Sequence, residues 1–141
     1  METTDKQTVT VETVIKAPIE KIWKQWTEPT HITRWYNASD YWHAPYAEND
    51  LRVNGKFKTT MAAKDGSMSF DFEGVYTNIV QYKTIQYTLL DGRKVKITFT
   101  EQGDSTKVVE AFETENENPA DMQRVGWQAI LDNFKKYAEA N

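Results

Sequence analysis

The sequence contains no cysteine and only two histidines, His31 and His43, in 141 residues. Without cysteine the chain has no disulfide, no thiolate nucleophile and no cysteine-based zinc site. Two histidines are too few for a histidine-rich metal site, so we expect neither a metal nor a cofactor. Charge of one sign is also scarce, because the net charge is only −4. That balance gives no electrostatic footprint for nucleic acid or an anionic lipid surface.

Long hydrophobic runs are missing as well. No stretch approaches the 18 apolar residues that a membrane-spanning helix needs, so no membrane span is expected. The first residues, Met1 to Thr8, are polar and lack the apolar segment of a secretory signal. We therefore expect a soluble, cytoplasmic protein. Its length suits one domain with one core, covering residues 1–141.

Aromatic residues, in contrast, are plentiful at 13%, including five Trp and seven Tyr. Such large, half-polar side chains suit a core or the wall of a cavity. Alternating apolar residues between Val9 and Ile15 predict a strand. Pro18 suits the first position of a helix, and Pro29 opens a second short helix. Residues 36–53 are aromatic but have no regular period, and we predict that they are irregular.

From residue 56 to 114 the pattern becomes regular. Apolar and polar residues alternate in runs separated by turn sequences such as Asp91-Gly92, which predicts an antiparallel meander. Asn118-Pro119 then predicts the start of a helix that continues to about Ala138, with one broad apolar face. A sheet and a helix that each have one apolar face bury both by packing together. The predicted class is α+β, a curved antiparallel sheet around a long C-terminal helix.

Four segments resemble a known group of proteins. The run Ile15–Trp23 (IKAPIEKIW) resembles the strand-to-helix entry of the START-like (SRPBCC) superfamily. Within that superfamily, Trp35, the run Asp50–Phe57 (DLRVNGKF) and the run Gly126–Phe134 (GWQAILDNF) resemble the activator of heat-shock-protein ATPase (Aha-type) family. The similarity follows the same order along nearly the whole chain. Asn54 departs from it, since the family often has glycine there, but asparagine tolerates a positive φ.

The resemblance implies the helix-grip (START/birch-pollen-allergen-like) fold. In that superfamily a cavity between the sheet and the long helix often holds lipids, sterols, polyketides or plant hormones. The family is named after a eukaryotic co-chaperone of the stress response, which implies a chaperone ATPase as a possible partner. That co-chaperone also uses a separate N-terminal domain, for which this chain has no room, so we expect weak or no ATPase stimulation. The matching motifs are structural and bring no catalytic residue with them.

The predicted ligand site is a cavity between the C-terminal helix and the sheet. Gly126 leaves space beside the helix, at a cost of about 1 kcal/mol relative to Ala. Tyr76 and Tyr87 offer hydroxyl groups that orient a ligand, and Trp35 and Trp42 line the mouth. The complete predicted set is Trp35, Trp42, Phe57, Thr59, Met61, Met68, Phe70, Phe72, Tyr76, Tyr87, Phe99, Gly126, Trp127, Ile130 and Phe134.

Catalytic candidates are weaker. His43 in the aromatic segment could act as a general acid or base, but a surface or packed histidine is the simpler interpretation. Asp71, Glu73 and Glu110 alternate with apolar residues, which predicts that they lie on the solvent face of the sheet. No triad order, phosphate loop or metal spacing is present, so we expect no catalytic residue. Three functions remain open: binding a small hydrophobic molecule, interaction with a protein partner, and cyclase or hydrolase chemistry in the same cavity.

Overall fold

The computed structural model describes residues 7–141, and the preceding part of the polar N-terminal segment lies outside the described residues. Seven strands form one antiparallel sheet in the order β1-β7-β6-β5-β4-β3-β2. Consecutive strands from β2 to β7 are neighbours, which confirms the meander. The strands are β1 (Thr8–Ile15), β2 (Trp42–Asn49), β3 (Lys56–Ala63), β4 (Ser69–Val80), β5 (Thr84–Leu89), β6 (Lys94–Gln102) and β7 (Ser105–Glu113).

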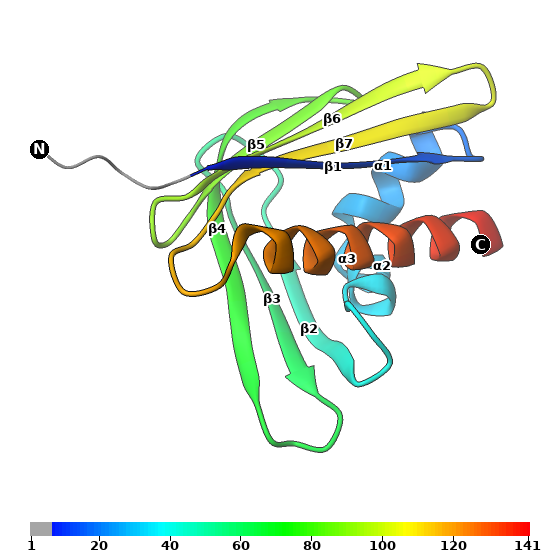
Figure 1. Cartoon of the computed structure of the whole chain (residues 1–141). Helices are drawn as coiled ribbons and strands as arrows, with labels where there is room; N and C mark the ends of the chain where they lie inside the picture. Colours follow the sequence, from blue (N-terminus) through cyan, green and yellow to red (C-terminus); the bar gives the residue numbers. More distant parts are fainter. Residues whose placement is uncertain (1–6) are drawn as a thin grey trace, which may run out of the picture.

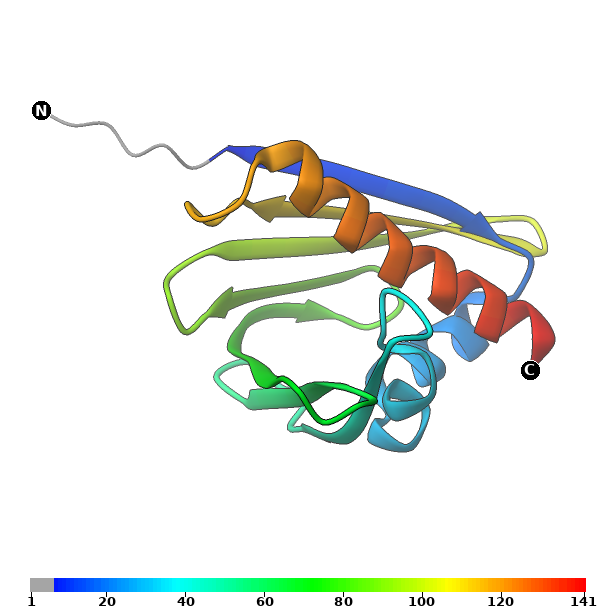
Figure 2. The ribbon, with the colours of Figure 1, turned by 60° about the horizontal axis from the view of Figure 1, so that its bottom comes forward.

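Three helices complete the fold: α1 (Ile19–Thr27), α2 (Pro29–Trp35) and α3 (Ala120–Ala140). The sheet curls, and α3 runs along the hollow of the curl while α1 and α2 close one end (Figures 1 and 2). This arrangement is the predicted helix-grip fold. None of the helices within residues 7–141 is both long and apolar enough to cross a membrane.

Two helices begin one residue later than predicted. Pro18 and Pro119 precede α1 and α3 with extended ψ values of 156° and 145°, so each lies outside its helix. Pro29, in contrast, is the first residue of α2, as the sequence predicted. The difference is small, because a proline adopts the same φ just before a helix and at its first position.

Strand β2 is a correction to the prediction that residues 36–53 are irregular. Its sequence, WHAPYAEN, does not alternate and contains Pro45. β2 is an edge strand that pairs only with β3, and its register shifts between His43 and Tyr46. Proline is tolerated at a bulge or an edge because no ladder hydrogen bond is needed from it there. Pairing with β3 therefore produces a strand that the local pattern does not reveal.

The C-terminal half of α3 is fixed by the core. Phe134 is fully buried, and its ring centroid lies 4.8 Å from that of Trp26 and 4.6 Å from that of Trp35. Trp35 is itself buried, and its indole Nε1 donates a hydrogen bond to the Gln25 carbonyl at 2.9 Å. The aromatic rings of α1, α2 and α3 thus form one packed end of the molecule.

The polar side of α3 covers the free edge of β1. Lys135 Nζ donates to the Val14 carbonyl at 2.7 Å, and Gln128 Nε2 donates to the Glu12 carbonyl at 3.2 Å. The backbone N–H of Lys16 donates to Glu139 at 2.9 Å. These bonds satisfy edge groups that would otherwise be open to pairing with another strand. They also set the rotation of α3, so that Gly126 and Trp127 face the interior of the curl.

Candidate functional site

A cavity of about 380 Å³ lies between the N-terminal half of α3 and the sheet. We call it the main cavity. Its size falls in the range of small-molecule sites. Its walls come from α3, from the long strands of the curl and from the segment after α2. The lining residues are Tyr36, Ala38, Trp42, Met61, Phe70, Phe72, Arg93, Glu110, Glu115, Asn118, Met122, Gln123, Gly126, Trp127 and Ile130.

Trp127 is the central aromatic group of the main cavity. Its ring is stacked on Phe112 of β7, with centroids 4.0 Å apart and planes 5° apart. Its centroid also lies 5.9 Å from that of Phe72 on β4, edge to face. Trp127 and Ile130 are partly buried and pack against the core. Their exposed surface is explained by the cavity that they line.

Gly126 borders the main cavity on the helix side. A Cβ atom built at this position has no heavy atom within 4 Å. The expectation that this glycine leaves room beside α3 is confirmed. A larger side chain can therefore enter the space without a clash with the surrounding backbone.

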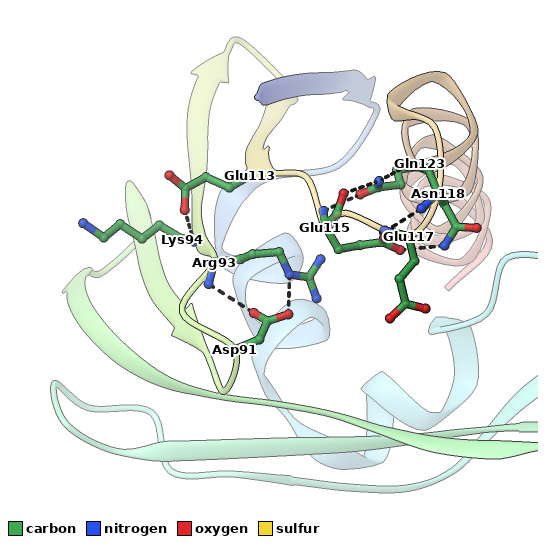
Figure 3. Close-up of polar contacts among 8 residues, drawn as sticks. All are labelled: Asp91, Arg93, Lys94, Glu113, Glu115, Glu117, Asn118 and Gln123. Atoms are coloured by element: carbon green, nitrogen blue, oxygen red, sulfur yellow. Dashed lines mark hydrogen bonds and ion pairs between the residues drawn. The ribbon is translucent and has the colours of Figure 1, made fainter. Parts of the chain in front are cut away.

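A polar network forms part of the rim (Figure 3). Gln123 accepts a hydrogen bond from the Glu115 N–H at 3.0 Å and donates to the Asn118 carbonyl at 2.8 Å. The Glu115 carboxylate in turn accepts from the Asn118 side chain at 2.6 Å and from the Glu117 N–H at 2.6 Å. The Asn118 bond is the main reason that the pKa of Glu115 is lowered. The network fixes the loop between β7 and α3 against the cavity.

Arg93 supplies the cationic group of the rim. Its Nε donates to Asp91 at 2.8 Å, and its side chain is only 18% exposed. Glu113 accepts a hydrogen bond from the neighbouring Lys94 N–H at 2.7 Å. Figure 3 shows Arg93 and Glu115 coming from separate loops at this end of the sheet. The rim therefore combines one cation with acidic and amide groups, while the interior is mostly aromatic.

A second, smaller space of about 40 Å³ lies deeper in the fold, and we call it the inner hollow. Tyr36, Phe72 and Glu110 line both spaces, so the main cavity and the inner hollow meet at these three residues. The remaining residues around the inner hollow are Trp26, Ile32, Trp35, Glu48, Asn49, Phe57, Thr59, Tyr76, Ile85 and Tyr87.

Glu110 is the main correction to the predicted site. Its side chain was expected on the solvent face, but the residue is 6% exposed and faces the cavity. Burial raises the pKa of its carboxyl group to about 8. The signal was present in the sequence, because Glu110 shares strand parity with the buried Val108 and Phe112. Lys107 and Glu113, of opposite parity, mark the outer face of β7.

The structure divides the predicted cavity residues into three groups. Trp42, Met61, Phe70, Phe72, Gly126, Trp127 and Ile130 line the main cavity. Trp35, Phe57, Thr59, Tyr76 and Tyr87, together with Phe72, line the inner hollow. Phe99, Phe134 and Met68 line neither space.

The residues of the third group line neither space for two different reasons. Phe99 and Phe134 are buried in the aromatic core between α1 and α3. Met68 was expected to point inward but is 58% exposed. It precedes β4 in the β3–β4 hairpin, whose tip extends beyond the helices (Figure 1). A side chain on the inward face of a strand is buried only where another element packs against that face, and none in the described part of the chain packs against the tip of this hairpin.

Several cavity residues were not predicted: Tyr36, Ala38, Arg93, Glu110, Glu115, Asn118, Met122 and Gln123. Apart from Glu110, they lie in loops or at helix ends, where periodicity carries no signal. His43, the histidine weighed as a catalytic candidate, is exposed on β2 and does not line the main cavity. Among residues 7–141, no three acidic or histidine side chains are grouped as a metal site.

The comparisons with known proteins agree with this architecture. The model of the family described as "Activator of Hsp90 ATPase homolog 1-like protein" matches residues 16–139. The chain belongs to this family, as the resemblance of its motifs indicated. No curated protein matches it in sequence.

Solved structures extend the likeness to the whole fold. An AHSA1-like protein from Aeromonas hydrophila is 40% identical with a TM-score of 0.90, covering 95% of this chain and 93% of that one. A protein from Cytophaga hutchinsonii is 56% identical with a TM-score of 0.82 and the same coverage. A protein from Chromobacterium violaceum is 21% identical with a TM-score of 0.84, covering 95% and 98% of the two chains, and shares the fold.

Proposed function

We propose that this protein binds a small hydrophobic or aromatic molecule in the main cavity. The observation that carries the proposal is a space of about 380 Å³ lined by aromatic side chains that the core leaves partly exposed. Ligand sites are mostly apolar with a few placed polar groups, and this composition fits that description. We propose a binding role rather than catalysis. Native mass spectrometry of freshly purified protein would reveal a molecule that co-purifies.

Filling the space beside α3 tests this proposal. We expect Gly126→Leu to weaken binding of prodan, a neutral naphthalene probe, at least tenfold, because the leucine side chain enters the main cavity. Leucine is a better helix former than glycine by about 1 kcal/mol, so the fold should survive. Probe fluorescence measures binding, and circular dichroism checks the helix.

Gly126→Ala is the matched control. It adds one methyl group, leaves most of the cavity open and should raise the free energy of unfolding by about 0.5–1 kcal/mol. Binding should therefore be retained in the alanine variant and lost in the leucine variant. Equal probe binding by all three proteins would contradict a site beside Gly126. No probe binding and no co-purifying molecule with the wild type would contradict the proposed function itself.

A co-chaperone role is the second candidate, and the family description supports it. On α3, the exposed large apolar residues are Met122 and Val125, at 60% and 69% exposure. Two such residues form a small patch compared with the roughly 800 Å² that each partner buries in a standard interface. The outer side of α3 by itself therefore offers too little apolar area for a stable complex.

We accordingly expect little or no stimulation of the Hsp90 ATPase by this protein. The measurement is the ATPase rate at increasing concentrations of the wild-type chain, with Val125→Asp as the comparison. Several-fold stimulation that the aspartate variant loses would favour the co-chaperone role and place its contact on the outer side of α3.

A further inference from the structure

Glu110 occupies the place where the main cavity and the inner hollow meet. It lies on β7, between Val11 of β1 and Ile97 of β6 in the register of the sheet. Both register neighbours are apolar, so neither offers a side-chain partner to the Glu110 carboxyl group. Its 6% exposure places it at the inner end of the cavity, away from the rim.

The carboxyl group of Glu110 has no hydrogen bond or ion pair with any of residues 7–141, and it lines both the main cavity and the inner hollow. Leaving an ionised carboxylate buried without a partner is strongly unfavourable. The group therefore holds its proton at neutral pH, in accord with a pKa raised to about 8 by burial. A protonated carboxyl group donates one hydrogen bond, and Glu110 makes none to any of residues 7–141.

Two tyrosine hydroxyl groups near Glu110 also lack a hydrogen-bond partner among the described residues. Tyr36 and Tyr87 border the inner hollow, and within the described part of the chain neither hydroxyl has a hydrogen-bond partner. Tyr76 differs, because its hydroxyl donates to Asn49 Oδ1 at 2.6 Å. The inner end of the site thus presents three O–H groups without a hydrogen-bond partner among residues 7–141, and the other carboxylate that borders the inner hollow is that of Glu48 on β2.

We propose that Glu110 anchors the ligand, and that the ligand is a neutral molecule with an apolar or aromatic body and a carbonyl oxygen at its inner end. The body fills the main cavity against Trp127 and Phe72, and the carbonyl oxygen accepts the hydrogen bond of the Glu110 carboxyl group. This inference rests on the proposed binding function and specifies the class of molecule that the same site takes.

A cationic ligand is the chief competing class, since a buried carboxylate among aromatic rings also suits an ammonium group. The two classes have opposite pH dependence. A carbonyl needs Glu110 protonated, so its hydrogen bond is lost as pH rises through about 8, the pKa of Glu110. An ammonium needs Glu110 ionised, so its binding strengthens over the same interval.

Other titratable groups around Glu110 do not obscure the pH dependence that is expected from Glu110. Burial raises the pKa of Tyr36, Tyr76 and Tyr87 above the usual range, so these hydroxyls keep their protons while Glu110 titrates. Glu48 borders the inner hollow from β2, while Arg93 and Glu115 stand at the rim. The residues of α3 that line the main cavity are Met122, Gln123, Gly126, Trp127 and Ile130, and none of them titrates.

Three naphthalenes provide the experiment: 2-acetylnaphthalene with a carbonyl, 2-ethylnaphthalene of nearly the same shape without one, and (2-naphthylmethyl)trimethylammonium, whose positive charge does not depend on pH. We expect wild-type protein at pH 6.5 to prefer the ketone over the hydrocarbon by about tenfold, the value of one added hydrogen bond. At pH 9.5 the preference should disappear, while the affinity for the hydrocarbon stays constant and so confirms an intact cavity.

Two variants locate the effect at Glu110. Glu110→Gln keeps an N–H donor but does not titrate, so the ketone preference should persist at both pH values. Glu110→Leu should remove it at both. If the hydrocarbon binds but wild type shows no ketone preference at pH 6.5, the anchor is wrong and the binding function stands. A preference for the quaternary ammonium probe that grows with pH overturns the carbonyl class, and failure of all three probes overturns the binding function as well.

A measurement without ligand adds an independent check. Because the pKa of Glu110 is raised above its ordinary value of 4.5 by folding, its contribution to stability is complete below that value. The contribution is lost as pH rises towards about 8. The wild-type unfolding midpoint should therefore fall relative to that of Glu110→Gln between pH 5 and 8. Parallel midpoints would show that the carboxyl group is not held in its protonated form.

Discussion

Replacing Phe134 by alanine is expected to lower the free energy of unfolding by about 3–5 kcal/mol. Phe134 is fully buried, and its ring packs against Trp26 and Trp35 at the closed end of the curl. Truncation removes the transfer free energy of the ring and leaves a void that these two aromatic neighbours cannot fill without moving. Equilibrium unfolding in urea, followed by tryptophan fluorescence, measures the change.

Val125→Ala on the same helix is the control for Phe134→Ala. Val125 is 69% exposed, so its substitution should change the free energy of unfolding by no more than about 0.5 kcal/mol. A large effect at Phe134 and none at Val125 would confirm which face of α3 carries the packing. An unchanged midpoint for Phe134→Ala would contradict the placement of the helix in the curl.

Gly55→Ala is expected to be as damaging, by about 4 kcal/mol or more, for a different reason. A Cβ atom at Gly55 would lie 2.0 Å from the Asp50 carbonyl oxygen and 2.9 Å from that of Arg52. The turn cannot move aside freely. The Tyr76 N–H donates to the Gly55 carbonyl at 2.9 Å, and the Asn54 N–H donates to the Tyr76 carbonyl at 2.8 Å, which ties the turn to β4. Thermal unfolding and the yield of folded protein measure the effect.

Gly103→Ala separates this backbone clash from a loss of conformational freedom. Gly103 has a φ of +66° but open space around it, so alanine should cost only about 1–2 kcal/mol. Asn54, with a φ of 70°, shows that a residue other than glycine can occupy the left-handed region in the turn before β3. If Gly55→Ala costs no more than Gly103→Ala, the contact with Asp50 does not constrain the turn.

Much of the fold could be predicted from the sequence because its patterns are local. Strand alternation in β3–β7 and the apolar face of α3 reflect periods of two and 3.6 residues, which depend only on backbone geometry. The motif around Gly55 and the open position at Gly126 were equally visible. β2 was not, because an edge strand with a bulge at Pro45 has neither alternation nor strong strand propensity.

The candidate site was predictable only in part. The aromatic wall followed from strand parity, and Trp127 followed from the helical face. The polar rim could not be predicted, because Arg93, Glu115 and Gln123 are held in place by contacts of the loops, where the sequence has no regular period. Met68 shows the opposite error, since its parity is inward but the hairpin tip reaches beyond any packing partner.

The sequence by itself determined the class of fold, the order of the main strands, the long helix and the family of this protein. It determined them because they depend on local periodicity and on motifs that are contiguous in the chain. Only the tertiary structure decided that Phe134 is core while Trp127 lines a cavity, although both lie on one helical face. It also decided that Glu110 is buried. Burial depends on how far the sheet curls over α3, and that distance is set by contacts between elements that no local pattern contains.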